Sequence, residues 1–409
     1  MAVKRPGFGF VGNTGIRTKL WGVVLVLSIP LVVLSVMQYQ NQNSDISRAN
    51  SESDGFAYVA ATMPFLREVQ QHRSLAERFL AGQKSAEAAL KLSGEAGDAA
   101  LSKLEAAEKS YGSDFATKQY VDNIKVQWPK LRDVTAGQSA SDSAAAHTQL
   151  INESIFPLLE RVTTASKLQV DPSVDTRNAI VALTDVLPKM TESLSLARSY
   201  GATLLANNAG QELTVAQRQY LASQVVASGI YADTMVRDLQ AAMAQNKDFQ
   251  AALKPLLDRS QVNRASFMNA STADVLNTST LVNSASESYF LLGGSAIDSS
   301  NQLITAAQGV LDREFQARRD SATSSLYITG AATLGGIAVA IALALVIAFS
   351  ITRPIRRLAE VADRMSLGEL DIEIGVEGMN EVGQLAESLR RMQASLRSAI
   401  ERLRVRRAA

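Results

Sequence analysis

The sequence predicts an all-α protein with two transmembrane helices, an extracytoplasmic helical bundle and a cytoplasmic coiled-coil module. The 409 residues include 46% hydrophobic residues but only 6% aromatics, 24 glycines and 9 prolines, a composition that favours long helices over sheets. Two long uncharged apolar runs, at residues 20–37 and 326–351, divide the chain. Apolar residues with coiled-coil spacing follow the second run.

The overall composition argues against several classes of function. The chain carries 41 basic and 40 acidic residues, which gives no electrostatic reason to expect a nucleic-acid partner. Cysteine is absent, which excludes disulfides, cysteine nucleophiles and cysteine-ligated metals. The two histidines, His72 and His147, are far apart in sequence, which argues against a zinc site. Because no catalytic constellation is visible either, we expect no enzyme activity, no cofactor and no metal.

The first apolar run predicts a transmembrane helix at residues 20–37. It is long enough to span a bilayer, and Trp21 and Tyr39 near its ends suit the membrane interface. The alternative is a cleaved signal peptide. The length of the run and the lack of an A-x-A-like cleavage site favour the membrane span.

The second apolar run, residues 326–351, predicts another transmembrane helix, and its glycine- and alanine-rich middle suits close packing against a partner copy. Residues 1–19 carry four basic residues and no acid, and three arginines follow the second run directly. The positive-inside rule therefore places both termini in the cytoplasm and residues 38–325 outside, in a multi-pass membrane protein.

The outer segment, residues 38–325, reads as a bundle of six to eight amphipathic helices standing on the membrane. Apolar residues recur at spacings of three and four, which is typical of helices with one buried face. Clusters of glycine, serine, asparagine and proline predict breaks between the helices. These predicted breaks include residues 81–85, 93–100, 171–175, 207–214 and 292–300.

Two arginines inside this bundle are candidates for ligand binding. Arg73-Ser74 is followed by a Leu-Ala pair at the same spacing as Arg198-Ser199, which indicates an imperfect internal duplication. A guanidinium fork matches the shape of nitrate or a carboxylate and keeps its charge. Two such groups between helices would repel each other unless an anion neutralised them. The alternative is that Arg73 pairs with Glu68 or Glu77 on its own helix.

These two stretches resemble the nitrate- and nitrite-sensing (NIT) type of bacterial receptor domain. "QQHRSLA", residues 70–76, is similar to the family's Q-x-x-R-G-L-S pattern, and "RSYG", residues 198–201, to its R-G-x-G pattern, with serine for glycine in both. "LQVDPSVD", residues 168–175, resembles the linker L-x-L-D-P-D-x-D. The resemblance implies a small oxyanion held by arginines of opposing helices, and carries that role to Arg73 and Arg198.

The inner segment, residues 353–405, predicts a helix, an extended connector, a second helix and a basic tail. Pro354 suits the first turn of a helix, and Gly368 ends that helix. The apolar residues of the first helix have 3-4-3 spacing and those of the second have 3-4-3-4 spacing, and each set forms a seam of the kind that packs in a coiled coil. The connector alternates apolar and polar residues. The residues are Ile355, Leu358, Ala362 and Met365, then Leu370, Ile372 and Ile374, then Val382, Leu385, Leu389, Met392 and Leu396. One monomer cannot bury both seams, so a parallel homodimer with four helices is expected.

This pattern resembles the HAMP linker of histidine kinases and methyl-accepting chemotaxis receptors. Pro354, the pair Gly368-x-Leu370 and the run Glu381-Val382-Gly383 fall at the family's spacing. Asn380 replaces the usual aspartate, and we expect it to cap the second helix equally well. The resemblance implies that the module converts motion of the preceding membrane helix into a change of bundle packing.

Together these features and resemblances predict a transmembrane sensory receptor of the bacterial inner (cell) membrane that senses a small anionic ligand outside and relays the signal through HAMP. After Leu396 the chain shows no phospho-acceptor histidine, nucleotide-binding motif or methylatable coiled coil. We therefore expect the output domain to be lacking and the output to come from a cytoplasmic partner. The alternative is an adaptor without output that modulates a full-length chemoreceptor or sensor kinase by forming mixed HAMP dimers.

Overall fold

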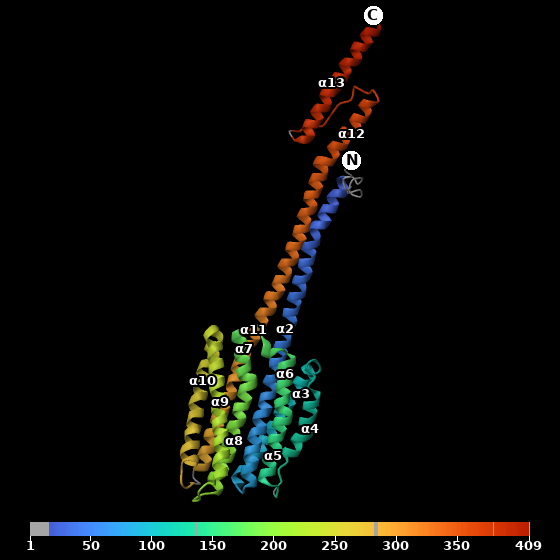
Figure 1. Ribbon diagram of the computed structural model, residues 1–409. Helices are drawn as coiled ribbons and strands as arrows, with labels where there is room; N and C mark the ends of the chain where they lie inside the picture. The colour runs from blue at the N-terminus through green and yellow to red at the C-terminus, as the bar shows by residue number, and fades with distance from the viewer. Residues whose placement is uncertain (1–15, 136, 282–284, 379, 409) are drawn as a thin grey trace, which may run out of the picture. The chain divides into compact units, whose positions relative to one another are not determined.

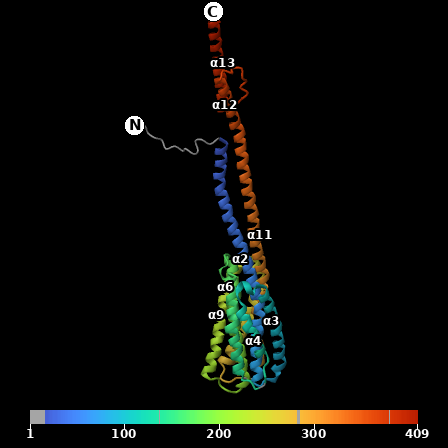
Figure 2. The same ribbon diagram turned by 90° about the vertical axis from the view of Figure 1, so that its right-hand side faces the viewer.

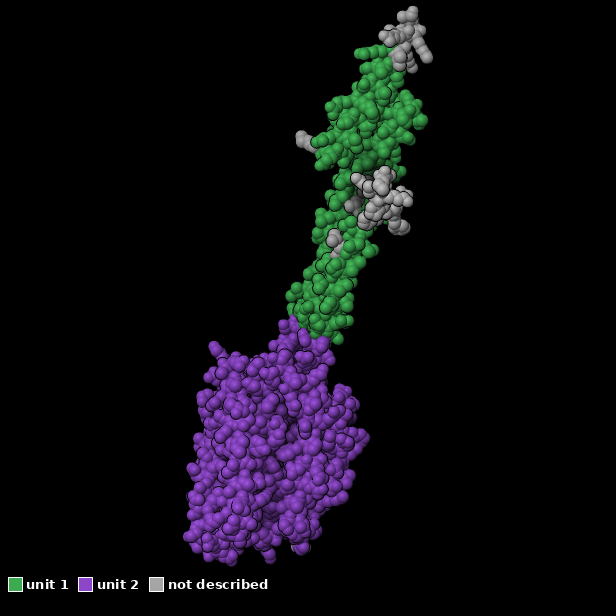
Figure 3. All heavy atoms as spheres, viewed as in Figure 1, with its two compact units in different colours: residues 1–43, 323–409 green, residues 44–322 purple. Residues whose placement is uncertain are grey.

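The computed structural model describes residues 16–135, 137–281, 285–378 and 380–408. The chain divides into two compact units (Figure 3): residues 44–322, which we call the bundle unit, and residues 1–43 with 323–409. Apart from an isolated bridge between Ala209 and Leu281, the regular elements of the described ranges are helical, which confirms the predicted all-α class. Most of the predicted cytoplasmic N-terminus, residues 1–19, lies outside the described residues.

Two very long helices carry the apolar runs. Helix α2 spans Ile16–Leu80 and helix α11 spans Ala285–Ile347, and both are long and apolar enough to cross a membrane. Large apolar side chains in these runs, such as Leu34 in α2 and Leu334 in α11, are exposed in the structure. Exposure of such side chains is what helices that face lipid require.

The bundle unit is built from the outer parts of α2 and α11 together with the helices between them, which run alongside one another (Figures 1 and 2). Its helices in chain order are α3 (Glu87–Phe115), α4 (Lys118–Arg132), α5 (Ala140–Leu150), α6 (Phe156–Ala165), α7 (Val174–Val181), α8 (Leu187–Asn207), α9 (Val215–Gln245) and α10 (Lys247–Ala270). Short 3-10 turns lie at Lys84–Ala86 and Leu168–Val170, and a π turn at Ser271–Leu276 extends α10. A single core of buried apolar residues runs through the unit.

Three prolines are each preceded by a π turn that lets the helix continue past them. A π turn joins α5 to α6 at Ile151–Ile155, α7 to α8 at Ala182–Val186, and α11 to α12 at Ala348–Thr352. Pro157, Pro188 and Pro354 each stand two residues after such a turn. Proline lacks the N–H that an α-helix needs, and the wider turn absorbs the interrupted hydrogen-bond ladder. The paired segments therefore continue as single rods.

Two of the expected breaks are wrong. The breaks at 81–85, 171–175 and 207–214 are confirmed, but residues 93–100 lie inside α3 and residues 292–300 lie inside α11. A methyl group on Gly97 would meet the Trp128 ring at 2.2 Å, and one on Gly293 would meet the Arg198 side chain at 2.6 Å. These glycines therefore allow close approach of a bulky neighbour and do not end a helix.

The second unit contains α12 (Arg353–Ser366), an extended connector and α13 (Glu381–Ala408). Gly368 has a φ of +94°, a left-handed conformation that ends α12 and favours glycine. At the start of α13, the side-chain oxygen of Asn380 accepts a bond from the N–H of Gly383 at 3.1 Å, which confirms the expected cap. A methyl group on Gly383 would collide with the carbonyl of Gly378, so the connector can pass closely only because residue 383 is glycine.

The connector packs onto both helices of this unit. Its Ile374 and Val376 join a small core with Leu358, Met365, Ala386 and Leu389. Gln393 on α13 donates to the carbonyls of Leu370 and Ile372 at 2.9 and 2.7 Å, and Arg390 donates to those of Ile374 and Val376. These four carbonyls of the connector are therefore satisfied by side chains of α13 and not by a neighbouring strand.

Candidate functional site

Arg73 lies on α2 and is fully buried in an ion pair with Glu192 of α8. Its two terminal nitrogens donate to the two carboxylate oxygens of Glu192 at 2.6 and 3.1 Å. Further bonds go to the hydroxyls of Thr148 and Ser195, while Gln70 donates to Glu192 at 3.0 Å. The carboxylate of Glu192 therefore fills the guanidinium fork where an anionic ligand was expected.

The partner of Arg73 was not foreseen from sequence. Glu68 and Glu77, the candidates on its own helix, make no ion pair with it within 4.0 Å. Glu77 lies near enough for Arg73 and Arg198 to lower its pKa, but burial outweighs them and raises that pKa to about 7. Arg73 is therefore ion-paired, as the alternative held, but its partner is Glu192, 119 residues away, and not a glutamate of its own helix.

Arg198 lies on α8 with its side chain buried, but without an acidic partner among the residues that the structure describes. One terminal nitrogen donates to the hydroxyl of Ser74 on α2 at 3.1 Å, and the guanidinium carbon lies 4.6 Å from the centre of the Phe290 ring. Within the described part of the chain, no carboxylate lies within 4.0 Å of it and its Nε has no hydrogen-bond partner. Burial lowers the pKa of Arg198 to about 10, and neighbouring guanidiniums add to that shift, although Asp298 opposes it.

The two predicted arginines thus meet at one helix–helix interface in a reciprocal arrangement. Arg73 of α2 bonds to Ser195 of α8, and Arg198 of α8 bonds to Ser74 of α2. The structure brings the two arginines together, as the repeat suggested. Both guanidiniums lie near enough to Glu77 to lower its pKa. They differ in charge balance: Glu192 neutralises Arg73, whereas Arg198 has no such partner among the described residues.

Two more arginines surround Arg198, and both have carboxylate partners. Arg67 on α2 bonds to Asp298 of α11 at 2.9 Å and to Glu68 at 3.2 Å. Arg78 pairs with Glu287, and its guanidinium also lies over the Phe290 ring, 4.3 Å from its centre. Within this cluster of four arginines, Arg198 alone has no ion pair among the described residues.

A cavity of about 450 Å³ opens against Arg198. Its wall includes Arg67, Glu68 and Gln71 from α2, residues of α3, and Asp298 from α11. This size falls in the range of small-molecule sites. Neither Arg73 nor Glu192 lines it. The arrangement offers a buried cation at the wall of an accessible space.

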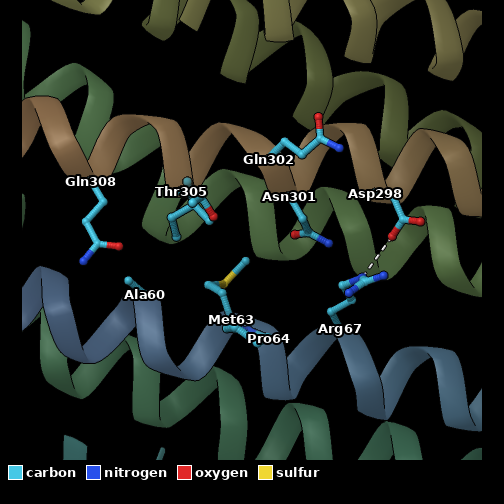
Figure 4. A pocket seen from close by; sticks show the side chains of 10 residues that line it. Ala60, Met63, Pro64, Arg67, Asp298, Asn301, Gln302, Thr305 and Gln308 are labelled. Atoms are coloured by element: carbon cyan, nitrogen blue, oxygen red, sulfur yellow. Dashed lines mark hydrogen bonds and ion pairs between the residues drawn. The ribbon is translucent and has the colours of Figure 1, made fainter. Parts of the chain in front are cut away.

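A second cavity, of about 330 Å³, follows the groove between α2 and α11 (Figure 4). Arg67 and Asp298 point toward each other across the groove and line both cavities. Asn301 lies beside them, and neither polar atom of its amide has a hydrogen-bond partner. The Arg67–Asp298 ion pair therefore stands between the two spaces.

The two histidines also lie together, which their separation in sequence did not suggest. His72 Nδ1 lies 2.9 Å from His147 Nε2, and both rings are buried. His147 Nδ1 lies 2.7 Å from the carbonyl of Ser143, which can only accept, so Nδ1 of His147 carries the hydrogen and its Nε2 accepts from His72. Burial lowers the pKa of His72 to about 4 and that of His147 to about 3. The pair is neutral at pH 7, and no group of three metal-ligating side chains occurs in the described ranges.

The predicted signalling residues of the second unit divide into two sets. Leu358, Met365, Ile374 and Leu389 are buried in its core, with Ala362 and Val382 packed against it. Leu385, Met392 and Leu396 remain exposed on α13, and Pro354, Ile355 and Leu370 are half-buried. The sequence analysis did not identify Ala386, which is fully buried and belongs to the same small core as Ile374 and Val376 of the connector. The second seam is thus only partly covered by this chain.

The comparison with known families decides the nature of this second unit. Residues 346–398 match the HAMP domain. Over 93 residues the chain is 34% identical to a putative sensory transducer protein of Acetivibrio thermocellus, and over 78 residues it is 38% identical to the methyl-accepting chemotaxis protein TlpB of Bacillus subtilis. These segments cover 23% and 19% of this chain and only 16% and 11% of the relatives' own lengths. HAMP and these similarities support a chemoreceptor-like signal-transduction receptor.

A likeness to a solved structure covers most of the fold. The structure of the NasR transcription antiterminator aligns with a TM-score of 0.50 over 88% of this chain and 94% of that one. The sequences are 13% identical, so the likeness concerns the fold alone. It agrees with the predominantly helical architecture described above.

Proposed function

We propose that this protein is a transmembrane receptor whose bundle unit binds a small anionic ligand at Arg198 and whose HAMP domain relays the change. The observation that carries the proposal is a buried guanidinium that has no carboxylate partner in the described part of the chain and lies at the wall of a cavity of about 450 Å³. Burying an unpaired charge costs several kcal/mol, and an anion in the cavity would offset that cost. The positive-inside pattern supports an extracytoplasmic bundle and cytoplasmic termini.

The position of Arg198 also suggests how binding could be transmitted. Its side chain touches α2 through Ser74 and α11 through Phe290 and Gly293. These are the two helices that carry the apolar runs. A ligand that pulls the guanidinium toward the cavity changes contacts with both helices, and it shifts the receptor's equilibrium by its difference in affinity for the two states.

Arg73 takes a different part in this proposal. For Arg73 to contact the ligand, Glu192 would have to leave its fork, breaking two charge-assisted bonds. We therefore centre the proposed site on Arg198, with Arg73 holding Ser195 and Glu192 in place. Contact between Arg73 and the ligand requires a second arrangement of Glu192.

Calorimetry of the full-length protein in lipid nanodiscs, titrated with nitrate, acetate and succinate, tests the site. We expect at least one anion to bind, and Arg198→Met to reduce its affinity at least tenfold. Arg237→Met on α9, which removes an exposed arginine away from the cavity, serves as the matched control and should leave binding unchanged. Binding that survives Arg198→Met would overturn the assignment.

We also propose that the HAMP domain dimerises through the exposed apolar stripe of α13. Leu385, Met392, Leu396 and Ile400 follow each other at spacings of seven and four, and each is at least 41% exposed. Such a stripe is the seam of a coiled coil when a partner helix covers it. The homodimer is the simplest occupant, and a full-length receptor joining through the same stripe is the alternative.

Because the chain has no cysteine, single-cysteine variants give a clean test of this dimer. Met392→Cys in membranes should form an intermolecular disulfide on oxidation, whereas Ala394→Cys, on the opposite side of α13, should not. Crosslinking of this chain expressed alone supports the homodimer. Crosslinking only to a co-expressed chemoreceptor that carries a cysteine in the corresponding HAMP helix would favour the adaptor.

A further inference from the structure

We propose that the cavity at Arg198 takes a zwitterion, a small molecule with one carboxylate and one ammonium group such as a neutral amino acid. This inference deepens the proposed function, since it names the ligand class of the same site. The cavity has two cationic and two anionic side chains in its wall: Arg67 and Arg198, and Glu68 and Asp298. Its lining therefore carries no net charge.

The balance of charge disfavours a plain anion. An inorganic anion bound at Arg198 would leave the cavity with one excess negative charge next to Glu68 and Asp298. In a partly enclosed space of lowered dielectric, such an excess is costly. A zwitterion brings equal charges of both signs, so the filled cavity stays neutral. Both ligand classes place an anionic group at Arg198, and the neutrality of the filled cavity favours the zwitterion over nitrate or acetate.

The two charges of the ligand would find different partners. Among the described residues the Arg198 guanidinium makes one side-chain hydrogen bond, from Nη2 to the Ser74 hydroxyl, so it has terminal N–H donors left for a carboxylate. On α2, the contact that Glu68 makes within the described ranges is with Arg67, 3.2 Å to one carboxylate oxygen, which leaves the other oxygen to accept from an ammonium. Asp298 on α11 likewise uses one oxygen for Arg67. Burial raises the pKa of Glu68, as expected for a carboxylate that lacks sufficient cationic partners.

The rest of the wall fits an apolar or small side chain. Leu75 and Phe290 line the cavity, and Leu92 and Leu291 line it while remaining 65% and 59% exposed. Large exposed leucines at the wall of a charged cavity offer apolar surface that a ligand could cover. Ser93 and Ser295 add neutral hydroxyls. This wall suits aliphatic or hydroxyl-bearing side chains better than charged ones.

The test compares each zwitterion with the same molecule lacking its amine. Full-length protein in nanodiscs is titrated with glycine, alanine, serine, valine and leucine, and each one that binds is compared with its deaminated acid, for example 4-methylpentanoate for leucine. We expect the zwitterion to bind at least tenfold more tightly. Glu68→Gln should remove most of that advantage and leave the affinity of the deaminated acid within twofold. Glu160→Gln, at an exposed carboxylate of α6, is the control.

Each result separates this inference from the proposed function. If zwitterion and deaminated acid bind equally, both need Arg198, and Glu68→Gln has no effect, the site binds anions and the zwitterion is excluded. If none of the five amino acids binds while nitrate or acetate does, the zwitterion is likewise excluded and the anion site stands. If none of the amino acids and none of the anions binds, both proposals are wrong.

Discussion

Arg73 and Arg198 come from matching positions of a repeated sequence, yet their surroundings differ in one decisive respect. Arg73 is closed off by Glu192, with two charge-assisted bonds and further bonds to hydroxyls. Arg198 has one hydroxyl, one aromatic ring and an adjacent cavity. A buried ion pair of this kind fixes helix packing, whereas a buried unpaired cation is a cost that something outside the chain can relieve. The comparison teaches that repetition of a motif does not repeat its role.

The largest effect should come from breaking the Arg73–Glu192 pair. Arg73→Met leaves the Glu192 carboxylate buried without its cation, which we expect to cost about 3–5 kcal/mol of stability. For a unit of this size the thermal midpoint should fall by roughly 10 °C. Fluorescence of Trp128, buried in the bundle against Phe65 and His72, reports unfolding of this unit in the full-length protein in detergent.

The matched control for this prediction is the double variant Arg73→Met/Glu192→Met. Replacing both charges with apolar groups of similar size removes the unpaired carboxylate, so most of the lost stability should return. A double variant that is no more stable than Arg73→Met would show that the pair is not what holds α2 to α8.

A smaller effect should follow from adding a methyl group beside Arg198. Gly293→Ala places its Cβ 2.6–2.8 Å from the stem of the Arg198 side chain. Overpacking of this kind costs about 1–3 kcal/mol, against a gain of roughly 1 kcal/mol from the better helix propensity of alanine. We expect a net loss of up to about 2 kcal/mol, measured by the same Trp128 transition.

Two companion variants isolate the cause. In the Arg198→Ala background the contacts with Cγ and Cδ are gone and only the contact with the Cβ of residue 198 remains, so Gly293→Ala should cost less than it does in the native background. Gly309→Ala, on the same helix with open space around its Cβ, should stabilise in either background. Equal losses for Gly293→Ala with and without Arg198 would contradict the fit between this glycine and the arginine.

Much of the fold follows from local sequence patterns. The apolar runs in α2 and α11 and the seams around Leu358 and Leu389 are contiguous periodicities, and a periodicity indicates which face of a helix is buried. Gly368 and Asn380 act at the ends of helices, where the chemistry is also local. These features were predictable because each depends on residues within a few turns.

The candidate site was only half predictable for the opposite reason. The repeat pointed to Arg73 and Arg198, but the partner Glu192 lies 119 residues from Arg73, and only the packing of α2 on α8 brings them together. The Gly293-Gly294 pair did carry a signal in the sequence, and taking it for a helix break was wrong. Two glycines in an apolar helical stretch can equally mark a close approach, here by the side chain of Arg198.

Titration of Glu77 offers a third way to compare the two arginines. Its pKa is raised to about 7 by burial, despite the lowering influence of both guanidiniums. An acid whose pKa is higher in the folded state contributes stability below the unfolded pKa, near 4.5, and loses it as pH rises to about 7. The stability of the native protein relative to Glu77→Gln should therefore fall between pH 4.5 and 7, by at most about 1.4 kcal/mol per pH unit.

Removing Arg198 should extend to higher pH the range over which the stability contribution of Glu77 declines. In the Arg198→Met background the carboxylate of Glu77 loses a favourable cation, so its folded-state pKa rises and the decline continues above pH 7. The measurement is the pH dependence of the Trp128 transition for Glu77→Gln and its parent in both backgrounds. A difference that does not change with pH would mean that Glu77 does not titrate in the folded protein.

The smallest expected effect on stability belongs to Arg198→Met, and its sign is the sharpest test of the comparison. The substitution loses a hydroxyl bond and a cation–π contact, worth roughly 1–2 kcal/mol together, but it also removes the cost of burying an unpaired cation. In protein dialysed free of small molecules, the thermal midpoint should stay within about 3 °C of the native value or rise. A fall as large as that of Arg73→Met would mean that Arg198 is ion-paired in the folded protein, and the distinction between the two arginines would disappear. An unchanged midpoint with loss of ligand binding would identify Arg198 as a residue retained for the ligand, because the fold does not need its charge.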